Sequence, residues 1–114
     1  INHAGTPRKR DEEYLSNWRN GLKTLAQAPN TVIKISGLGM FDQQWTPDSI
    51  KPLVLDCIEI FGINRCFFST NFPVDKKYSS YEKVWNSYFD ITKDFSIDEK
   101  EKLFFKNAEK YYRI

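Results

Sequence analysis

The apolar positions of this chain follow two different periods, one typical of strands and one typical of helices. Short apolar or β-branched segments occur at residues 1–3, 31–36 and 65–70, and the first of them looks like the end of a strand. They recur at a spacing of about 34 residues, and each closes on small or polar residues. Longer segments with helical spacing lie between them, so the pattern predicts alternating strands and helices.

Two helices are predicted between the strands, each with recognisable ends. The first follows Asp11, a typical N-cap, and stops before Pro29. The second follows Thr46, has Pro47 at its first position, where the missing N–H costs nothing, and stops at Gly62. The apolar face of the first helix is expected to contain Tyr14, Leu15, Trp18, Leu22, Leu25 and Ala26, and that of the second Ile50, Leu53, Val54, Cys57, Ile58 and Phe61.

Capping boxes predict two further helices near the end of the chain. Ser79 with Glu82 would open one, and Ser96 with Glu99 would open the other. In this motif the Ser side chain accepts a hydrogen bond from the backbone of the Glu, whose side chain reaches back to the Ser backbone. Strands that alternate with helices in this way predict a parallel sheet.

The number of strand–helix units is too small for a closed barrel. A (β/α)8 barrel takes roughly 250 residues, or about 31 per unit, and 114 residues hold little more than three units. Three parallel strands leave an edge of unpaired backbone groups, and a flavodoxin-like sheet needs about five strands. The length allows one modest core and no second domain. We therefore expect residues 1–114 to be a fragment of a larger α/β domain.

Charge and cysteine content bear on the class of protein. The net charge is +2, and the one dense basic run, residues 8–10, is followed at once by three acidic residues. This favours a solvated loop over a nucleic-acid-binding patch. No segment approaches the roughly 20 apolar residues of a membrane span, and we expect no signal peptide. Cys57 and Cys66 fall on predicted buried positions, and as reduced thiols they favour a cytoplasmic protein.

Side chains at the strand ends are the candidates for chemistry, because parallel α/β folds place their ligand sites there. This position selects His3, Ser36 and Asn71. His3 is the only histidine, and histidine is both the usual acid or base near neutral pH and the commonest metal ligand. Gly5 and Pro7 predict a tight loop directly after it. A hydrogen-bonded structural histidine remains the alternative.

The loop after the third strand combines apolar residues with an amide and a carboxylate. Phe72 is placed to wall a pocket, and Asp75 provides the carboxylate. A cap for the next segment, or a pair with Lys76 or Lys77, is the structural alternative for Asp75. No HxH, HExxH or CxxC spacing occurs, so the sequence contains no complete metal motif. The glycines of residues 37–39 lack the rest of a phosphate-binding loop.

Taken together, these segments resemble the amidohydrolase-related family that includes L-fuconolactonase-like and 2-pyrone-4,6-dicarboxylate lactonase-like enzymes. The resemblance runs from end to end, with the motifs in the family's order and spacing. The residues that carry it are Asn2-His3-Ala4-Gly5-Thr6-Pro7, Trp18, Leu25-Ala26, Pro29-Asn30, Lys34-Ile35-Ser36-Gly37-Leu38, Phe61-Gly62, Arg65-Cys66-Phe67-Phe68-Ser69-Thr70-Asn71-Phe72-Pro73-Val74-Asp75 and Asn107-Ala108-Glu109-Lys110-Tyr111-Tyr112-Arg113-Ile114.

This resemblance implies the C-terminal part of a (β/α)8 TIM barrel, about strands six to eight with their helices. The implied activity is hydrolysis of a lactone or a related ester or amide bond, with water as nucleophile. His3 matches the end of the sixth strand, residues 32–36 match the seventh, and Asn71 matches the end of the eighth. Many relatives carry Asp there, which takes a proton from the attacking water. An amide cannot act as that base, so Asp75 is the candidate to replace it, and His3 is expected to polarise or protonate the substrate.

The remaining implications concern ligands and partners. Ser36, Phe72 and Arg8 are candidate substrate-binding residues, and His3 is the candidate ligand for a divalent metal, zinc or manganese, although metal-independent lactonases also occur in this group. The expected partners are a small polar substrate and the N-terminal half of the barrel, without nucleic acid or membrane, and a homo-oligomer stays open. Two alternatives remain: a non-catalytic, incomplete domain, or a decarboxylase of the same superfamily.

Overall fold

The computed structural model describes residues 1–113, which form two parallel strands and the helices around them. Strand β1 (Ile33–Ile35) pairs with β2 (Cys66–Phe68) in parallel, with Ile33 opposite Cys66. On the other side of β1, the backbone N–H of Lys34 donates to the carbonyl of Ile1 at 2.9 Å. The parallel pairing of the second and third predicted strands is confirmed, although both are shorter than predicted. The first predicted segment, residues 1–3, is not assigned as a strand, and His3 instead opens a 3₁₀ turn.

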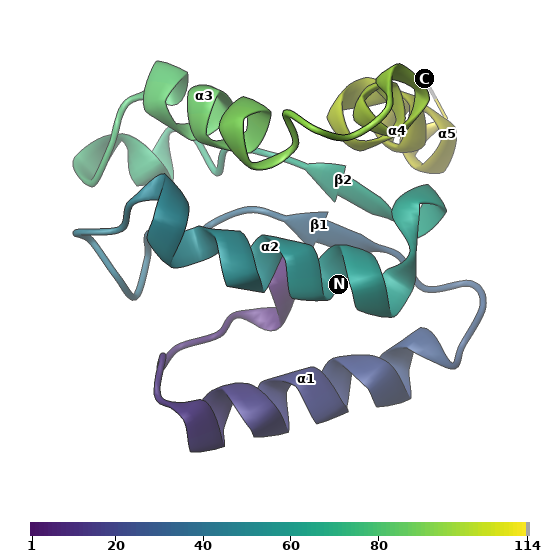
Figure 1. The fold of residues 1–114 in the computed structure, drawn as a ribbon, viewed down its shortest axis with the longest axis horizontal. Helices are drawn as coiled ribbons and strands as arrows, with labels where there is room; N and C mark the ends of the chain where they lie inside the picture. The colour runs from purple at the N-terminus through teal and green to yellow at the C-terminus, as the bar shows by residue number, and fades with distance from the viewer. Residues whose placement is uncertain (114) are drawn as a thin grey trace.

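The main helices lie in a row beside the strands, as Figure 1 shows. Helix α2 (Pro47–Phe61) is the middle one and contacts both strands, α1 (Glu12–Ala26) and α3 (Tyr81–Ile91). The C-terminal segment consists of α4 (Ile97–Glu101), a π-helical turn (Lys102–Lys106) and α5 (Asn107–Tyr112). The π-helical turn and α5 pack against β2. The described helices include none that is long and apolar enough to cross a membrane.

The predicted helix starts depend on side-chain caps that the structure largely confirms. Asp11 accepts a hydrogen bond from the backbone N–H of Tyr14 at 3.0 Å. Thr46 and Ser49 form a reciprocal capping box at the start of α2, and the backbone of Gly62 ends that helix with a φ of 80°. The predicted box between Ser96 and Glu99 is also present. These caps satisfy N–H groups that a helix end otherwise leaves unpaired.

The predicted capping box of Ser79 with Glu82 is wrong by one residue. The cap of α3 is Ser80, whose side chain accepts from the backbone N–H of Lys83 at 3.0 Å. The backbone N–H of Ser79 instead donates to the carbonyl of Asp75, and so belongs to the preceding 3₁₀ turn, Val74–Lys77. Ser79 is therefore bonded to the turn and is not the N-cap of α3. Ser80 takes the N-cap position, one residue later than the motif predicted.

The core is formed mainly by α2 and the strands. Of the six apolar residues predicted for the buried face of α2, all but the half-buried Ile58 are buried. On α1 the prediction is only partly right, because just Trp18 and Leu22 are buried and Leu25 is 47% exposed. An open hollow lies along α1, lined by Leu25 together with Gly5, Trp18 and Leu22. Helical periodicity identifies an apolar face, but what covers that face depends on the neighbouring elements.

The cysteines and the C-terminal helix also behave as structural elements. Cys57 and Cys66 are both free and buried, as predicted, and burial raises the pKa of the Cys66 thiol to about 12. The side-chain amide of Asn107 donates to the carbonyls of Ile63 at 2.7 Å and Cys66 at 2.8 Å. This pair of hydrogen bonds ties α5 to the start of β2. Ile114, the last residue of the closing motif, lies outside the described residues.

Candidate active site at the strand ends

His3 and Ser36, two of the predicted site residues, are in direct contact. Nδ1 of His3 lies 2.9 Å from Oγ of the fully buried Ser36. His3 has a φ of 50° and opens a short 3₁₀ turn. Gly37 makes this approach possible, because a Cβ at that position would lie 2.7 Å from His3 Nδ1. The φ of Gly37 is 64°, so glycine is favoured there by conformation as well as by space.

Asn71 and Asp75 form the second contact, at the end of β2. The side-chain amide of Asn71 donates to Oδ1 of Asp75 at 2.9 Å, and the backbone N–H of Asp75 donates to the carbonyl of Asn71 at 3.0 Å. Asp75 is only 3% exposed. Its side chain contacts Asn71 rather than Lys76 or Lys77, the pairing that the sequence left open. The amide at the strand end therefore positions the carboxylate that follows it.

The charges of His3 and Asp75 act on each other. Burial raises the pKa of Asp75, while the hydrogen bond from Asn71 and the charge of His3 oppose that rise. Burial and the charge of Lys34 lower the pKa of His3, while the charge of Asp75 opposes that fall. The environment thus moves the two pKa values toward each other. Titratable pairs perturbed in this way by burial and a specific partner are typical of acid–base sites.

Lys34 is a neighbour of this site that the sequence analysis did not select. It alternates with the buried Ile33 and Ile35, so its side chain lies on the same side of β1 as that of Ser36. Its Nζ donates to the hydroxyl of Tyr112 at 3.2 Å. The sequence signal that could have identified Lys34 is its charge, because the rest of this strand is apolar.

Trp45 is a second residue that the sequence analysis missed. It is 3% exposed, and its indole N–H is buried without a hydrogen-bond partner among the described residues. It lies in the loop before α2, close to Gly39 and Asp75. A Cβ at Gly39 would be 2.7 Å from Trp45 Nε1 and 3.7 Å from Asp75 Oδ2. Nothing in the residue pattern around Trp45 predicted this position.

The other predicted substrate-binding residues lie around the site without contacting His3. The guanidinium of Arg8 lies over the ring of Phe41, 5.6 Å from its centroid. The ring of Phe72 packs edge-on against Tyr81 at 5.5 Å. Arg10 reaches further inward than Arg8, since its Nη2 donates to the carbonyl of Leu38 at 2.9 Å. Substrate binding by Arg8 and Phe72 stays a prediction.

The described residues do not form a complete metal site. Among residues 1–113, no three His, Cys, Asp or Glu side chains lie close enough together to hold a metal ion. His3 and Asp75 are the potential ligands at the strand ends, and a tetrahedral zinc site normally requires three or four protein ligands. The donor set of this chain therefore does not fit a bound metal without ligands from elsewhere.

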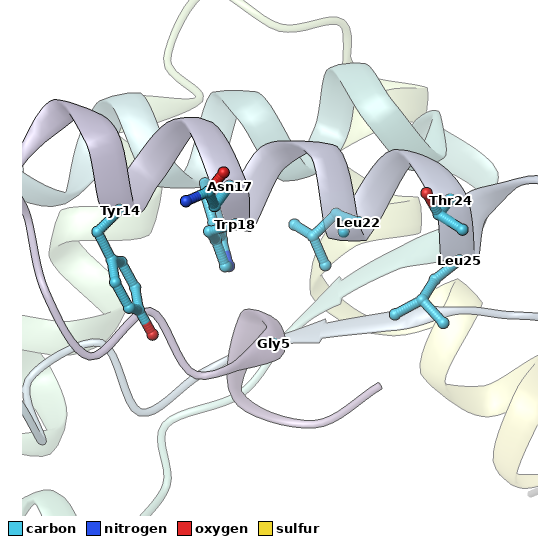
Figure 2. A pocket seen from close by; sticks show the side chains of 8 residues that line it. Gly5, Tyr14, Asn17, Trp18, Leu22, Thr24 and Leu25 are labelled. Carbon is cyan, nitrogen blue, oxygen red and sulfur yellow. The ribbon is translucent and has the colours of Figure 1, made fainter.

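A large apolar hollow lies away from the site. It measures about 600 Å³ and is lined by α1 and Gly5. Figure 2 shows Tyr14, Trp18, Leu22 and Leu25 on one side of α1, facing Gly5. No candidate acid, base or metal ligand lines this hollow, so we place the chemistry at the strand ends instead.

The chain is similar to several known proteins. The chain is 46% identical over its whole length to the protein y4mH of Sinorhizobium fredii, and spans 38% of that protein. It is 30% identical over 95 residues to an L-fucono-1,5-lactonase of Burkholderia multivorans, a match that covers 74% of the chain and 32% of the lactonase. A crystal structure of an amidohydrolase from B. multivorans with bound Zn superposes with a TM-score of 0.90 at 26% identity, and covers 99% of this chain and 43% of that one.

These matches confirm the predicted fold and show how much of it is present. The structure is the C-terminal part of a (β/α)8 barrel, and the chain spans about two fifths of the length of the relatives it matches. The amidohydrolase family model matches residues 1–114. The chain belongs to the amidohydrolase family.

Proposed function

We propose that the full-length protein containing this chain is a hydrolase of lactones or related ester or amide bonds in small polar substrates. The observation that carries the proposal is that His3 and Asp75 follow the two segments that flank β1, and that each is held by a hydrogen-bond partner. The relatives described as an amidohydrolase and an L-fucono-1,5-lactonase support the same class of reaction.

The two side chains suit the two proton transfers of hydrolysis. Asp75 Oδ2 takes a proton from the attacking water, whose oxygen forms a bond to the substrate carbonyl carbon. When the bond from that carbon to the leaving oxygen breaks, the imidazolium form of His3 donates its Nε2 proton to the leaving oxygen and becomes neutral. The other ring proton, on Nδ1, can be donated to Oγ of Ser36, which orients the ring. Return of a proton from Asp75 to His3 restores the starting state.

A divalent metal, zinc or manganese, is a further proposal for the full-length protein. The relative with bound Zn supports it, and His3 is the ligand that this chain would contribute. The other ligands would have to come from residues outside this chain. The measurement is metal content after purification, for the wild type and for His3→Asn, with less bound metal expected in the variant.

The hydrolase proposal is tested by assaying the full-length protein on a panel of sugar lactones and simple esters, with and without chelator. We expect turnover that falls at least tenfold, and typically about a hundredfold, in His3→Asn, because positioned proton transfer contributes about that much. Unchanged turnover would make His3 structural, and no turnover on any substrate would count against the hydrolase. Product analysis separates hydrolysis from decarboxylation, since only decarboxylation releases carbon dioxide.

A further inference from the structure

The side chain of Trp45 has a buried donor that the fold does not use. The two buried tryptophans differ in this respect: Trp18 Nε1 donates to the carbonyl of Ala4 at 2.8 Å, whereas Trp45 Nε1 is buried and has no partner among residues 1–113. Leaving a buried N–H unpaired is costly. Such groups are rare in folded proteins, and those that persist often have a functional reason.

The orientation of the Trp45 ring is fixed by Lys83 of α3. Nζ of Lys83 lies over the indole, 4.4 Å from the ring centroid, and also donates to the Trp45 carbonyl at 3.1 Å. A cation over the face of Trp is attractive, so the two contacts hold both the ring and its backbone. The indole ring of Trp45 is therefore held in place and is not a freely rotating side chain. Its N–H keeps one direction, in which it has no protein acceptor among residues 1–113.

Asp75 faces the same small space as this N–H. The point where a Cβ of residue 39 would stand is 2.7 Å from Trp45 Nε1 and 3.7 Å from Asp75 Oδ2. Because residue 39 is glycine, no side chain collides with the indole N–H. Oδ1 of Asp75 is already bonded to Asn71, so Oδ2 is the oxygen left for a ligand. A donor and an acceptor thus converge beside Gly39.

We propose that Trp45 and Asp75 hold the nucleophilic water between them, with the indole N–H donating to the water oxygen and Oδ2 accepting one of its protons. This inference rests on the proposed hydrolase function and adds a residue to it. A water molecule matches the pair because it accepts and donates at once. A substrate carboxylate would meet the negative charge of Asp75, and a carbonyl oxygen has no proton for Oδ2. The second water lone pair remains free to attack the carbonyl carbon.

The first test looks for the water directly. In the full-length protein labelled with ¹⁵N-tryptophan, rotating-frame cross-relaxation from water to the indole protons has the opposite sign to chemical exchange, so the two are separable. We expect a cross-peak at Trp45 and none at Trp18, whose N–H is already bonded to Ala4. Gly39→Ala should abolish the cross-peak, because the added Cβ would collide with the indole N–H and exclude a water molecule from it. Gly21→Ala is the matched control, because nothing lies within 4 Å of a Cβ there.

The second test separates a water-holding role from substrate binding. Trp45→Phe should lower kcat about tenfold or more, because a misplaced reactant is costly, and should leave KM nearly unchanged because no substrate contact is lost. Trp18→Phe is the control for a buried tryptophan lost elsewhere, and should lower Tm with little change in kcat.

Three outcomes would overturn the inference. They are a missing cross-peak at Trp45, a cross-peak with unchanged kcat in Trp45→Phe, and a raised KM with unchanged kcat, which would assign Trp45 to the substrate. If the wild type hydrolyses no substrate, the proposed function fails. The cross-peak still decides in that case whether Trp45 and Asp75 share a water molecule.

Discussion

At the scale of single residues, the site depends on a few positions with unusual backbone conformation. His3 and Asn71 have φ values of 50° and 60°, in the left-handed region that only glycine adopts freely. Each uses this conformation to reach a buried partner, Ser36 and Asp75 respectively. Positive φ at non-glycine residues is often found at functional sites, where the surrounding contacts maintain it. Here the contacts are the two hydrogen-bonded pairs at the strand ends.

The pH dependence of activity should report the contact between Asn71 and Asp75. The hydrogen bond from Asn71 lowers the pKa of Asp75 and thereby opposes the effect of burial. Asn71→Gly removes that bond and tolerates the φ of 60°. The pKa of Asp75 should then rise, so the acid limb of the kcat/KM profile should move to higher pH. A limb that stays in place would mean that Asp75 is not the base.

Replacing Asp75 should separate stability from activity. Its pKa is raised above 3.8 by burial, so the folded state binds the proton more tightly than the unfolded state. Stability is therefore lost as pH rises through the folded pKa, because the ionised form of Asp75 is the one that burial disfavours. Asp75→Asn should raise Tm at pH 7 while abolishing most activity, and the gain should disappear at acidic pH, where Asp75 is protonated. A lower Tm at pH 7 would indicate a structural carboxylate.

At the scale of elements, short loops and helix caps place the site residues. The loop from Ser36 to Gly39 touches His3 through its first two residues, and Trp45 and Asp75 through its last. The 3₁₀ turn Val74–Lys77 brings Asp75 back toward the end of β2, and α3 begins at Tyr81, after a short link. Because α3 also carries Lys83, its start affects both Asp75 and Trp45.

Cap variants at the start of α3 test the corrected helix boundary. Ser80→Ala removes the side chain that accepts from the Lys83 backbone, and should lower the free energy of unfolding by about 1 kcal/mol. Ser79→Ala should change it by less than about 0.5 kcal/mol, as expected for a surface position without such a role. Urea unfolding of both variants provides the comparison. A larger loss of unfolding free energy in Ser79→Ala than in Ser80→Ala would instead identify Ser79 as the cap, as the sequence motif predicts.

At the scale of the whole molecule, several of the apolar residues left exposed lie on helices at the two ends of the row. Leu25 of α1 is 47% exposed, and Phe89 of α3 is 54% exposed. Phe105, in the turn that follows α4, is 45% exposed and lines an apolar surface with Phe89 and Phe104. Contiguous exposed apolar surface often marks an interaction site. The relatives, which are more than twice as long as the matched region, have additional chain that would cover such surfaces.

We therefore expect residues 1–114 on their own to associate and to lack hydrolase activity. Size-exclusion chromatography with light scattering should show species larger than the 13.5 kDa chain. Phe89→Lys combined with Phe105→Lys should reduce this association, whereas Lys100→Ala, on the polar rim of the same surface, should not. A cooperative monomer that hydrolyses a lactone would contradict both expectations.

The sequence predicted the elements better than it predicted the contacts between them. The alternation of strands and helices, the caps at Asp11 and Thr46, and the buried face of α2 followed from local patterns, and the structure confirms them. The cap at Ser79 failed because two adjacent serines satisfy the same local rule, and the choice between them depends on the turn before the helix. Leu25 failed because periodicity does not show what covers a helix face.

In the candidate site, too, the sequence predicted the positions of residues better than the contacts between them. The position of His3, Ser36 and Asn71 at strand ends was determined by the sequence, because strand order and side-chain alternation are local properties that any parallel α/β fold converts into one edge. The pairing of Asn71 with Asp75, the coupling of Asp75 with His3, and the convergence of Trp45 on Gly39 were decided only by the tertiary structure. These contacts join loops that follow different strands, and their distances depend on how the helices pack. No local pattern contains that information.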